Sequence, residues 1–437
     1  MISDRVSADQ TSTFPRFLDL AYPNIESAEG VWLSTTRGAK ILDACSGGAM
    51  VSNLGHGAPD IVQAGARQAE RIAYFYMDHF TNEPQEELAA LLVAVAAPEM
   101  ARVRFGSSGS EANETALRLA RAYHVDRGEP ARWRVISPAQ AYHGSTMATL
   151  ALSGRKHTLQ EPYTPYLSHH LHIAPSTWRF DVTGEAALRE LDQRLEEAGP
   201  ETIAAFFCEP VSGAALPAYS SPDKFWLGLH QRREKHGFLI CFDEVVTGMG
   251  RVGSWFAYQQ LPIEPDIVTI GKGLGAGYAP ISAVLCKQHV YDAVERGSRF
   301  FDLGHTWDGA PISCATGLAV LNAMIDQRLI ERVRERGPRL LEQLQAALHG
   351  NPIVAEVRGR GFLLGIDLVD LPEEMHADER VEDIALGRGL LVTTTHSTQD
   401  GYAGDEVVFA PAFTSSDGEL DMMIERLAAT LGDVASR

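Results

Sequence analysis

Two short apolar runs past the middle of the chain constrain its fold more than any other feature. Phe238–Phe242 and Ile267–Ile270 carry no polar alternation and are bounded by turn residues, a pattern typical of buried parallel strands. The first run leads into Asp243, and the second leads into Lys272, which stands between two glycines. Because ligand sites in open α/β sheets form at the carboxyl ends of strands, the sequence predicts an acid and a lysine at one sheet edge.

Lys272 is one of only six lysines in the chain. A lysine beside a buried strand costs desolvation energy, but a neutral amine in that place can form a Schiff base. Pyridoxal phosphate requires such a lysine and also a carboxylate that pairs with its pyridinium nitrogen. Asp243 fits the second requirement. A solvated loop lysine is the alternative interpretation of Lys272.

A glycine motif in the same stretch offers another alternative. It spells G-x-G-x-x-G after a strand, and acidic residues follow at about the distance of a ribose-binding carboxylate, as in an NAD-dependent oxidoreductase. The prolines that follow, Pro262 and Pro265, leave little room for the helix that such a site needs. The three glycines are Gly248, Gly250 and Gly253.

Composition argues against several classes of partner. The 437-residue chain has a formal net charge of −19, which disfavours binding to nucleic acid or to an anionic membrane surface. The five cysteines are scattered, as is typical of reduced thiols, so we expect a cytoplasmic protein. We expect no secretory signal and no membrane span. His169, His170 and His172 lack metal-ligand spacing, so no metal site is expected.

A candidate phosphate site follows a predicted strand at Val103–Phe105. Ser108 and Glu111 match the S-x-x-E capping box at the start of a helix. Free N–H groups and the helix dipole make such an N-terminus favourable for anions. The sequence therefore predicts that Gly109 and Ser110 hold a phosphate, with a plain capped helix as the alternative.

Two more predicted strands end in residues that suit the same edge. Trp133–Ser137 precedes AYHGST, so Tyr142 and His143 would present an aromatic face that can stack on a flat ring. Thr202–Cys208 precedes Glu209, which adds a carboxylate. A packed loop aromatic is the alternative for Tyr142.

The order of these segments predicts an α/β fold with a three-layer, mostly parallel sheet and a smaller α+β lobe built from both termini. The pattern changes near residue 325, beyond which a long helix and an alternating strand pair are predicted. We expect the first part of the smaller lobe at 1–58, the large domain at 59–324 and the rest of the lobe at 325–437.

Together these motifs resemble the class III, omega-type aminotransferases among the fold-type I pyridoxal phosphate enzymes. The resemblance runs from about Gly30 to the C-terminus, and the GMGRVG glycines belong to the family's own pattern, which makes the dinucleotide alternative remote. It rests on the order and spacing of SGSEANETA, AYHGST, CEPVSG, FDEVVTGMGRVG, GKGLGAGYAP, GHTWDGAPISCATGLAVL and VRGRGFLLGI.

The resemblance implies roles for the matched residues. Lys272 would form the Schiff base with pyridoxal 5′-phosphate and move the substrate proton, Asp243 would pair with the pyridinium nitrogen, and Glu209 would gate the substrate side. Tyr142 and Val245 would cover opposite faces of the ring. The implied cofactor-binding residues are Ser108, Gly109, Ser110, Tyr142, His143, Gly144, Asp243, Val245 and Lys272, together with Thr306 from the partner subunit.

The resemblance also implies an activity and an assembly. The family transfers an amino group from an amine or omega-amino donor to a 2-oxo acid such as pyruvate, by a ping-pong mechanism. It implies a homodimer with active sites at the interface, or a tetramer, acting on small molecules and not on nucleic acid or membranes. A decarboxylase or aminomutase of the same fold is the alternative enzyme, and a cofactor-binding regulator is the non-enzymatic one.

The substrate pocket departs from the family pattern. Many relatives carry an arginine where this chain has Tyr402 and Ala403, and that arginine binds a substrate carboxylate. Arg358 is the other family position for a carboxylate clamp, and a structural arginine is the alternative. Tyr76 and Trp307 suggest a roomy aromatic pocket.

Overall fold

The computed structural model describes residues 5–7, 10–96, 99–154, 161–371, 376–396 and 404–436. Near the N-terminus, β1 (Arg5–Val6) pairs with β2 (Tyr22–Pro23) in an antiparallel ribbon. None of the helices within these ranges is long and apolar enough to cross a membrane.

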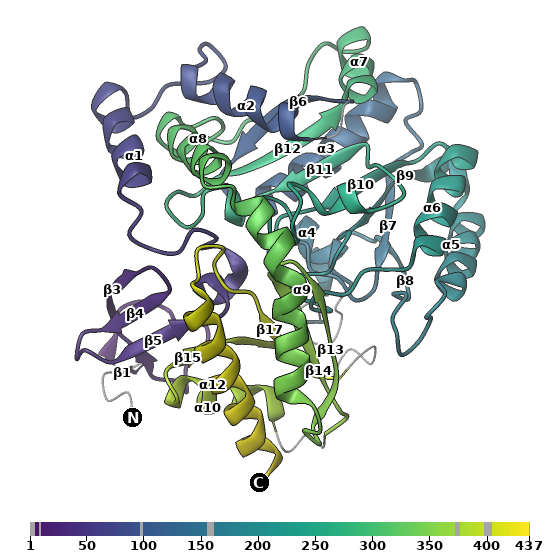
Figure 1. The fold of residues 1–437 in the computed structure, drawn as a ribbon. Coiled ribbons are helices and arrows are strands. Elements are labelled where there is room, and N and C mark those ends of the chain that lie inside the picture. The colour runs from purple at the N-terminus through teal and green to yellow at the C-terminus, as the bar shows by residue number, and fades with distance from the viewer. Residues whose placement is uncertain are drawn as a thin grey trace.

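A central sheet dominates the larger part of the molecule (Figure 1). Within the described ranges it has seven strands in the order β6-β12-β11-β10-β9-β7-β8. Of these seven strands, β12 runs opposite to the other six, so the prediction of a mostly parallel sheet is confirmed. The strands are β6 (Met100–Gly106), β7 (Arg134–Pro138), β8 (Leu171–Ile173), β9 (Ile203–Cys208), β10 (Leu239–Asp243), β11 (Ile267–Ile270) and β12 (Ser282–Lys287).

Helices cover both faces of this sheet, which explains why its strands lack polar alternation. In β10, Leu239 and Cys241 pack into one apolar cluster with α3. The intervening Ile240 and Phe242 pack on the opposite face, where Trp226 of α6 meets the Phe242 ring. The helices of this part are α1 (Pro59–Arg71), α2 (Glu83–Val95), α3 (Gly109–Asp126), α4 (Met147–Leu152), α5 (Glu185–Ala198), α6 (Asp223–His236), α7 (Gln288–Arg296) and α8 (Pro311–Asp326).

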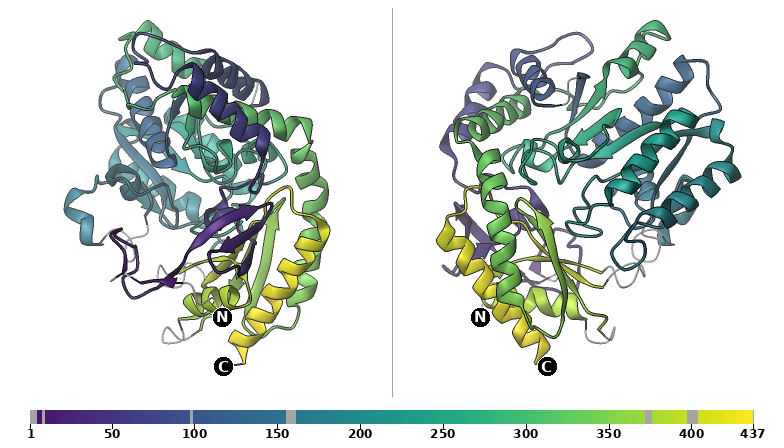
Figure 2. Two further views of the ribbon diagram at one scale, coloured as in Figure 1. Left: turned by 90° about the vertical axis from the view of Figure 1, so that its left-hand side faces the viewer. Right: turned by 45° about the vertical axis from the view of Figure 1, so that its right-hand side comes forward.

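Segments from the two ends of the chain share a second region, seen below the large sheet in Figure 1 and from two further sides in Figure 2. There β15 pairs in parallel with β5, with Leu390 opposite Leu42. Among the described residues the region holds the sheets β15-β5-β4-β3 and β13-β14-β17-β16. Its elements are β3 (Ile25–Glu29), β4 (Trp32–Thr35), β5 (Lys40–Asp43), α9 (Leu329–Leu348), β13 (Val354–Arg360), β14 (Leu363–Leu368), α10 (Ala377–Gly387), β15 (Leu390–Leu391), β16 (Thr393–Thr395), β17 (Glu406–Phe409) and α12 (Asp417–Ala435).

The GMGRVG glycines serve packing, so the dinucleotide alternative is wrong. A Cβ on Gly250 would lie 2.3 Å from Ile330 Cδ1 of α9. Met249 and Arg251 on either side are fully buried. The loop is followed by the short 3₁₀-helix Ala257–Gln260 and not by the long helix that would present its N-terminus to a pyrophosphate.

Candidate active site

Three charged side chains meet beyond the carboxyl ends of β9, β10 and β11. Burial lowers the pKa of Lys272 below its ordinary value, while the nearby carboxylates of Asp243 and Glu209 oppose that shift. Asp243 lies opposite Thr269 in the parallel pairing of β10 with β11, and Phe242 lies opposite Cys208 of β9, so the sheet brings the three residues to one edge, as the apolar runs predicted. Asp243 is the last residue of β10, and Glu209 and Lys272 follow β9 and β11 within two residues, so the geometry comes from the neighbouring positions of β9, β10 and β11 in the sheet.

Lys272 occupies an unusual backbone position, and its amine makes no hydrogen bond or ion pair in the described part of the chain. Its φ is 41°, in the left-handed region that side chains other than glycine rarely adopt. It begins the 3₁₀ turn Lys272–Leu274 between two glycines. An amine without such contacts is suited to accept a covalent partner or a proton.

Asp243 is held on all sides by hydrogen bonds. Its Oδ1 accepts the backbone N–H of Val245 at 3.0 Å. Its Oδ2 lies 2.9 Å from His143 Nδ1 and accepts the Asn113 amide N–H at 2.7 Å. Since a carboxylate offers only acceptors, His143 Nδ1 must carry the hydrogen in that contact. The carboxylate is therefore fixed in one plane at the end of β10.

Asn113 is the residue of this site that we did not predict from the sequence. It lies on α3 and is 1% exposed. A signal was present, because helical spacing puts Asn113 on the stripe formed by Ala112, Ala116 and Ala120. A polar side chain on a buried stripe needs a polar partner. Finding that partner required the fold.

The N-terminus of α3 lies beside the same residues. Ser110 Oγ accepts the N–H of Ser145 at 3.1 Å, which ties the helix to the loop that follows β7. A Cβ on Gly109 would lie only 2.8 Å from Val245 Cγ1. Glycine therefore lets the helix end approach the Asp243 loop closely, with its first N–H groups directed outward.

The predicted capping box at this helix is partly wrong. Ser108 Oγ does accept the N–H of Glu111 at 3.2 Å. The Glu111 carboxylate, however, turns to Ser107, accepting its N–H at 2.7 Å and its hydroxyl at 2.6 Å. Ser107 offers two donors to one carboxylate oxygen, whereas the backbone of Ser108 offers one, so the bonds to Ser107 replace the reciprocal bond of the box.

Glu209 is a second carboxylate at this edge, and burial raises its pKa above the ordinary value. It accepts the N–H of Gly213 at 2.8 Å and that of Tyr142 at 3.4 Å. The Glu209 carboxylate thus links the turn after β9 to the aromatic residue after β7. This contact holds the backbone of Tyr142 close to the Lys272 end of the sheet.

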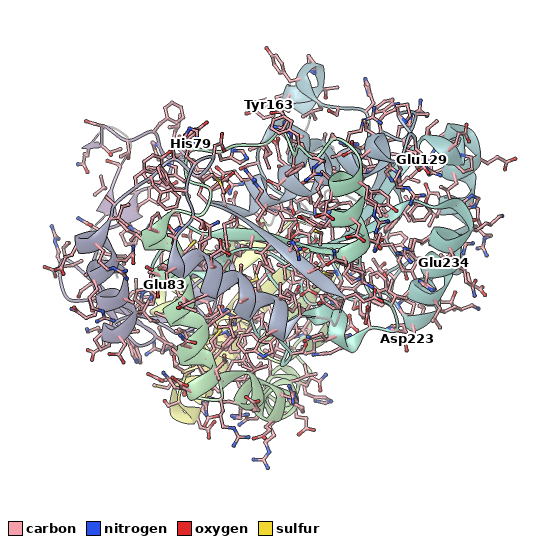
Figure 3. All side chains as sticks on the ribbon, turned by 90° about the horizontal axis from the view of Figure 1, so that it is seen from above. His79, Glu83, Glu129, Tyr163, Asp223 and Glu234 are labelled. Carbon is pink, nitrogen blue, oxygen red and sulfur yellow. The ribbon has the colours of Figure 1, made fainter. Side chains whose placement is uncertain are left out.

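Three predicted site residues lie elsewhere in the single chain. Trp307 and Tyr76 are 55% and 54% exposed, and Thr306 is also exposed. Trp307 meets Tyr74 edge-on, and Tyr76 meets His79. In the view from above, His79 and Glu83 lie on the opposite side of the molecule from Glu129 and Glu234 (Figure 3). No described hydrogen bond or ring contact joins these three residues to the Lys272 cluster.

Arg358 is already paired with acids. It forms ion pairs with Glu406 and, at 2.9 Å, with Glu356, and its side chain is 11% exposed. Burial lowers the pKa of Arg358, but the two carboxylates outweigh burial and raise it. Its role as a substrate clamp stays a prediction that requires Glu406 to release it. Tyr402 and Ala403 lie outside the described residues.

The residues at this edge fit pyridoxal phosphate. An amine without a partner stands at the sheet edge, a fixed carboxylate stands beside it, and a glycine-opened helix N-terminus lies close enough for a phosphate. Tyr142 and Val245 come from the loops after β7 and β10. These are the amine, the carboxylate and the phosphate site that the cofactor requires.

Known proteins agree with this assignment. The chain matches the family Aminotransferase class-III over residues 18–431. It is 31% identical to the putrescine–pyruvate aminotransferase of Pseudomonas aeruginosa, over 94% of this chain and 91% of that protein.

Solved structures show the same fold. A thermostable (S)-enantioselective omega-transaminase from Thermomicrobium roseum aligns with a TM-score of 0.89 and 32% identity, covering 97% of this chain and 96% of that one. An amine transaminase from an uncultivated Pseudomonas species, solved in its PLP-bound form, aligns with a TM-score of 0.88 and 30% identity, covering 97% of each. The chain therefore belongs to the class III aminotransferases and is an omega-type, pyridoxal-phosphate-dependent transaminase of fold type I.

Proposed function

We propose that this transaminase moves an amino group from an amine or omega-amino donor to a 2-oxo acid such as pyruvate, by a ping-pong mechanism. The single observation that carries the chemistry is the buried Lys272 amine, whose pKa is lowered by burial and which interacts electrostatically with the Asp243 and Glu209 carboxylates. The substrate classes are supported by the relative from Pseudomonas aeruginosa, whose name gives putrescine and pyruvate.

The residues divide the work by position. The bound cofactor supplies an electron sink for the carbon that loses a proton. Lys272, whose pKa burial lowers, would take that proton and would deliver it to the cofactor carbon that keeps the amino group. Asp243 supplies the negative charge that pairs with the ring nitrogen, and the α3 N-terminus at Gly109 and Ser110 binds the phosphate.

Two further residues face the ring and the substrate in this proposal. Tyr142 and Val245 cover opposite faces of the flat cofactor, and His143 and Gly144 complete the wall after β7.

Glu209 orients Tyr142 through the N–H contact. Ser108 caps the phosphate-binding helix through the Glu111 N–H. Substrate contacts from Tyr76, Trp307 and Arg358 are part of the same proposal.

We propose a homodimer, with a tetramer as the alternative. Large apolar side chains are left on the surface of the single chain: Phe14, Phe80 and Phe300 are 92%, 65% and 68% exposed. Exposed apolar groups of this size favour an interface. Thr306 and Trp307 lie on the loop that follows Phe300, so a second copy could receive them in its own site.

The domain division and compartment remain part of this proposal. The division into 1–58, 59–324 and 325–437 is supported by the pairing of β15 with β5, which joins the chain ends. A reducing compartment such as the cytoplasm is supported by the five cysteines, all buried as free thiols.

The absorbance spectrum of the purified protein tests the function. We expect a visible band from bound cofactor that bleaches when donor amines are added without an acceptor and returns when a 2-oxo acid follows. Bleaching by putrescine but not by a carboxylate-bearing amine would define the donor class. Release of carbon dioxide, or rearrangement without any acceptor, would contradict a transaminase and support the decarboxylase or aminomutase alternative.

We expect Gly109→Ala to weaken cofactor binding. The new Cβ would lie 2.8 Å from Val245 Cγ1, so the helix N-terminus must move away from the Asp243 loop and lose charge-assisted phosphate contacts. Loss of one such contact is expected to raise the dissociation constant about tenfold. Equilibrium dialysis measures it. Gly432→Ala, where nothing lies within 4 Å, is the control, and equal affinity in both variants would contradict this phosphate site.

A further inference from the structure

A line of buried polar side chains runs from β11 through α3 to Asp243. The Thr269 hydroxyl donates to Asn113 Oδ1 at 2.6 Å. The Asn113 amide nitrogen donates to Asp243 Oδ2 at 2.7 Å and to the His143 carbonyl at 2.7 Å. Thr269 and Asn113 are 0% and 1% exposed, so water does not replace these contacts.

This arrangement allows the Asn113 amide only one orientation. Both groups that face its nitrogen, the Asp243 carboxylate and the His143 carbonyl, are acceptors. The group that faces its oxygen is a hydroxyl, which supplies the hydrogen that the oxygen needs. A flipped amide would set oxygen against two acceptors. Thr269 therefore completes the bonding of Asn113 and holds its side chain in place.

The fixed Asn113 amide restricts the position of the Asp243 carboxylate. Oδ2 is held from two directions, by Asn113 and by His143, and Oδ1 is held by the N–H of Val245. Val245 and His143 lie on the loops after β10 and β7, outside the strands and helices. Asn113 is anchored differently, because α3 and β11 are both regular elements of the core.

We propose that Asn113 and Thr269 are positioning residues that fix the Asp243 carboxylate against the ring nitrogen of the cofactor. Neither residue touches the cofactor, and both act through Asp243. The inference rests on the proposed role of Asp243. Without the pair, the carboxylate rotates about its side-chain bonds, its contact with the ring nitrogen lengthens, and the ring holds its proton less firmly.

Variants of similar volume separate this role from a contribution to stability. Asn113→Leu and Thr269→Val each leave the other polar group without a partner, which costs stability. The double variant removes both polar groups at once, so neither leaves the other unpaired, but Asp243 Oδ2 and the His143 carbonyl still lose the Asn113 donor, which costs stability. Thr269→Ser keeps the hydroxyl and loses only the methyl group. Thr115→Val is the control, because this buried threonine on α3 donates its hydroxyl to the Glu111 carbonyl and has no other side-chain hydrogen bond within the described ranges.

The readouts are the ¹⁵N resonance of ring-labelled pyridoxal phosphate across pH, the cofactor dissociation constant, and kcat and KM for one donor. We expect the double variant to fold with a lower free energy of unfolding than the wild type, because the His143 carbonyl loses a donor. Its ring nitrogen should lose its proton at lower pH, and its kcat should fall about tenfold, the worth of one hydrogen bond to a charged group. KM should stay within about twofold. Thr269→Ser should behave like the wild type.

Three outcomes would contradict the inference, and they are distinguishable. If Asp243→Asn shifts the ring resonance but the double variant matches Thr115→Val, then Asp243 acts without Asn113 and Thr269. If Asp243→Asn leaves the ring resonance unchanged, the proposed role of Asp243 fails and the positioning role fails with it. An effect of Thr269→Ser equal to that of Thr269→Val would assign Thr269 to packing through its methyl group.

Discussion

Lys272→Ala abolishes turnover of every donor, because no other amine stands beside Asp243 and Glu209 in the described part of the chain. The variant loses both the amine that binds the cofactor covalently and the base that moves the substrate proton. Positioned acid–base catalysis alone is worth about 10²- to 10⁴-fold. We therefore expect kcat/KM to fall by at least about a thousandfold, measured by pyruvate-dependent loss of the donor.

Two comparisons make this result specific. Lys224→Ala removes a lysine from an exposed ion pair with Glu185 and should leave kcat/KM unchanged. Small primary amines added to Lys272→Ala should restore part of the activity, since they can enter the space that the side chain leaves. Activity of Lys272→Ala within tenfold of the wild type would refute the assignment of the base.

The pH dependence of the free energy of unfolding tests the lowered pKa of Lys272 in the cofactor-free protein. Burial lowers the pKa of Lys272 in the folded protein from its model-compound value of 10.5. Between the lowered folded pKa and 10.5, the unfolded chain binds more protons than the folded one, so the free energy of unfolding rises with pH. Lys272→Met should flatten that rise in urea titrations of the cofactor-free protein. An identical slope in both proteins would contradict the lowered pKa.

Arg251→Met is expected to cause the largest loss of stability. The Arg251 side chain is fully buried, and burial lowers its pKa to about 10, which leaves it charged at neutral pH. It binds segments from both ends of the chain and the turn between β13 and β14, so methionine leaves several buried oxygens without donors. The acceptors are Ser46 Oγ at 3.0 Å, Asn53 Oδ1, the Phe362 carbonyl at 3.2 Å and the Pro411 carbonyl at 2.5 Å.

We expect Arg251→Met to reduce the free energy of unfolding by about 3–5 kcal/mol. Urea denaturation of the cofactor-free protein measures it. Arg296→Met, which breaks an exposed pair with Asp292, should cost about 0.5 kcal/mol or less. A loss below about 1 kcal/mol for Arg251→Met would show that the acceptors find other donors or water.

Arg251 also shows where sequence reading was insufficient. In the sequence it falls inside GMGRVG, a motif that fits a dinucleotide loop as well as a packing turn. Only the fold shows that Gly250 meets Ile330 and that Arg251 reaches Ser46 and Pro411. Arg251 is separated from Pro411 by 160 residues and from Ser46 by 205. The spacing of residues around Arg251 therefore cannot predict these contacts.

The capping box at α3 shows the same limit at short range. The S-x-x-E pattern correctly predicts the helix start and the bond from the Glu111 N–H to Ser108. It does not determine which backbone the carboxylate will reach, because Ser107 competes for that carboxylate with two donors. The local sequence pattern determines where the helix begins, and the surrounding N–H and hydroxyl donors determine which hydrogen bonds the Glu111 carboxylate forms.

By itself, the sequence determined the sheet, the carboxyl-end positions of Asp243, Glu209 and Lys272, and the helix N-terminus suited to a phosphate. These follow from apolar runs and their endings, which are local and repeat with a fixed period. Only the tertiary structure revealed the line from Thr269 through Asn113 to Asp243, the burial of Arg251 and the ion pairs of Arg358. Each of these features depends on which polar groups become buried next to one another when distant segments of the chain pack. A single stretch of sequence does not contain that information.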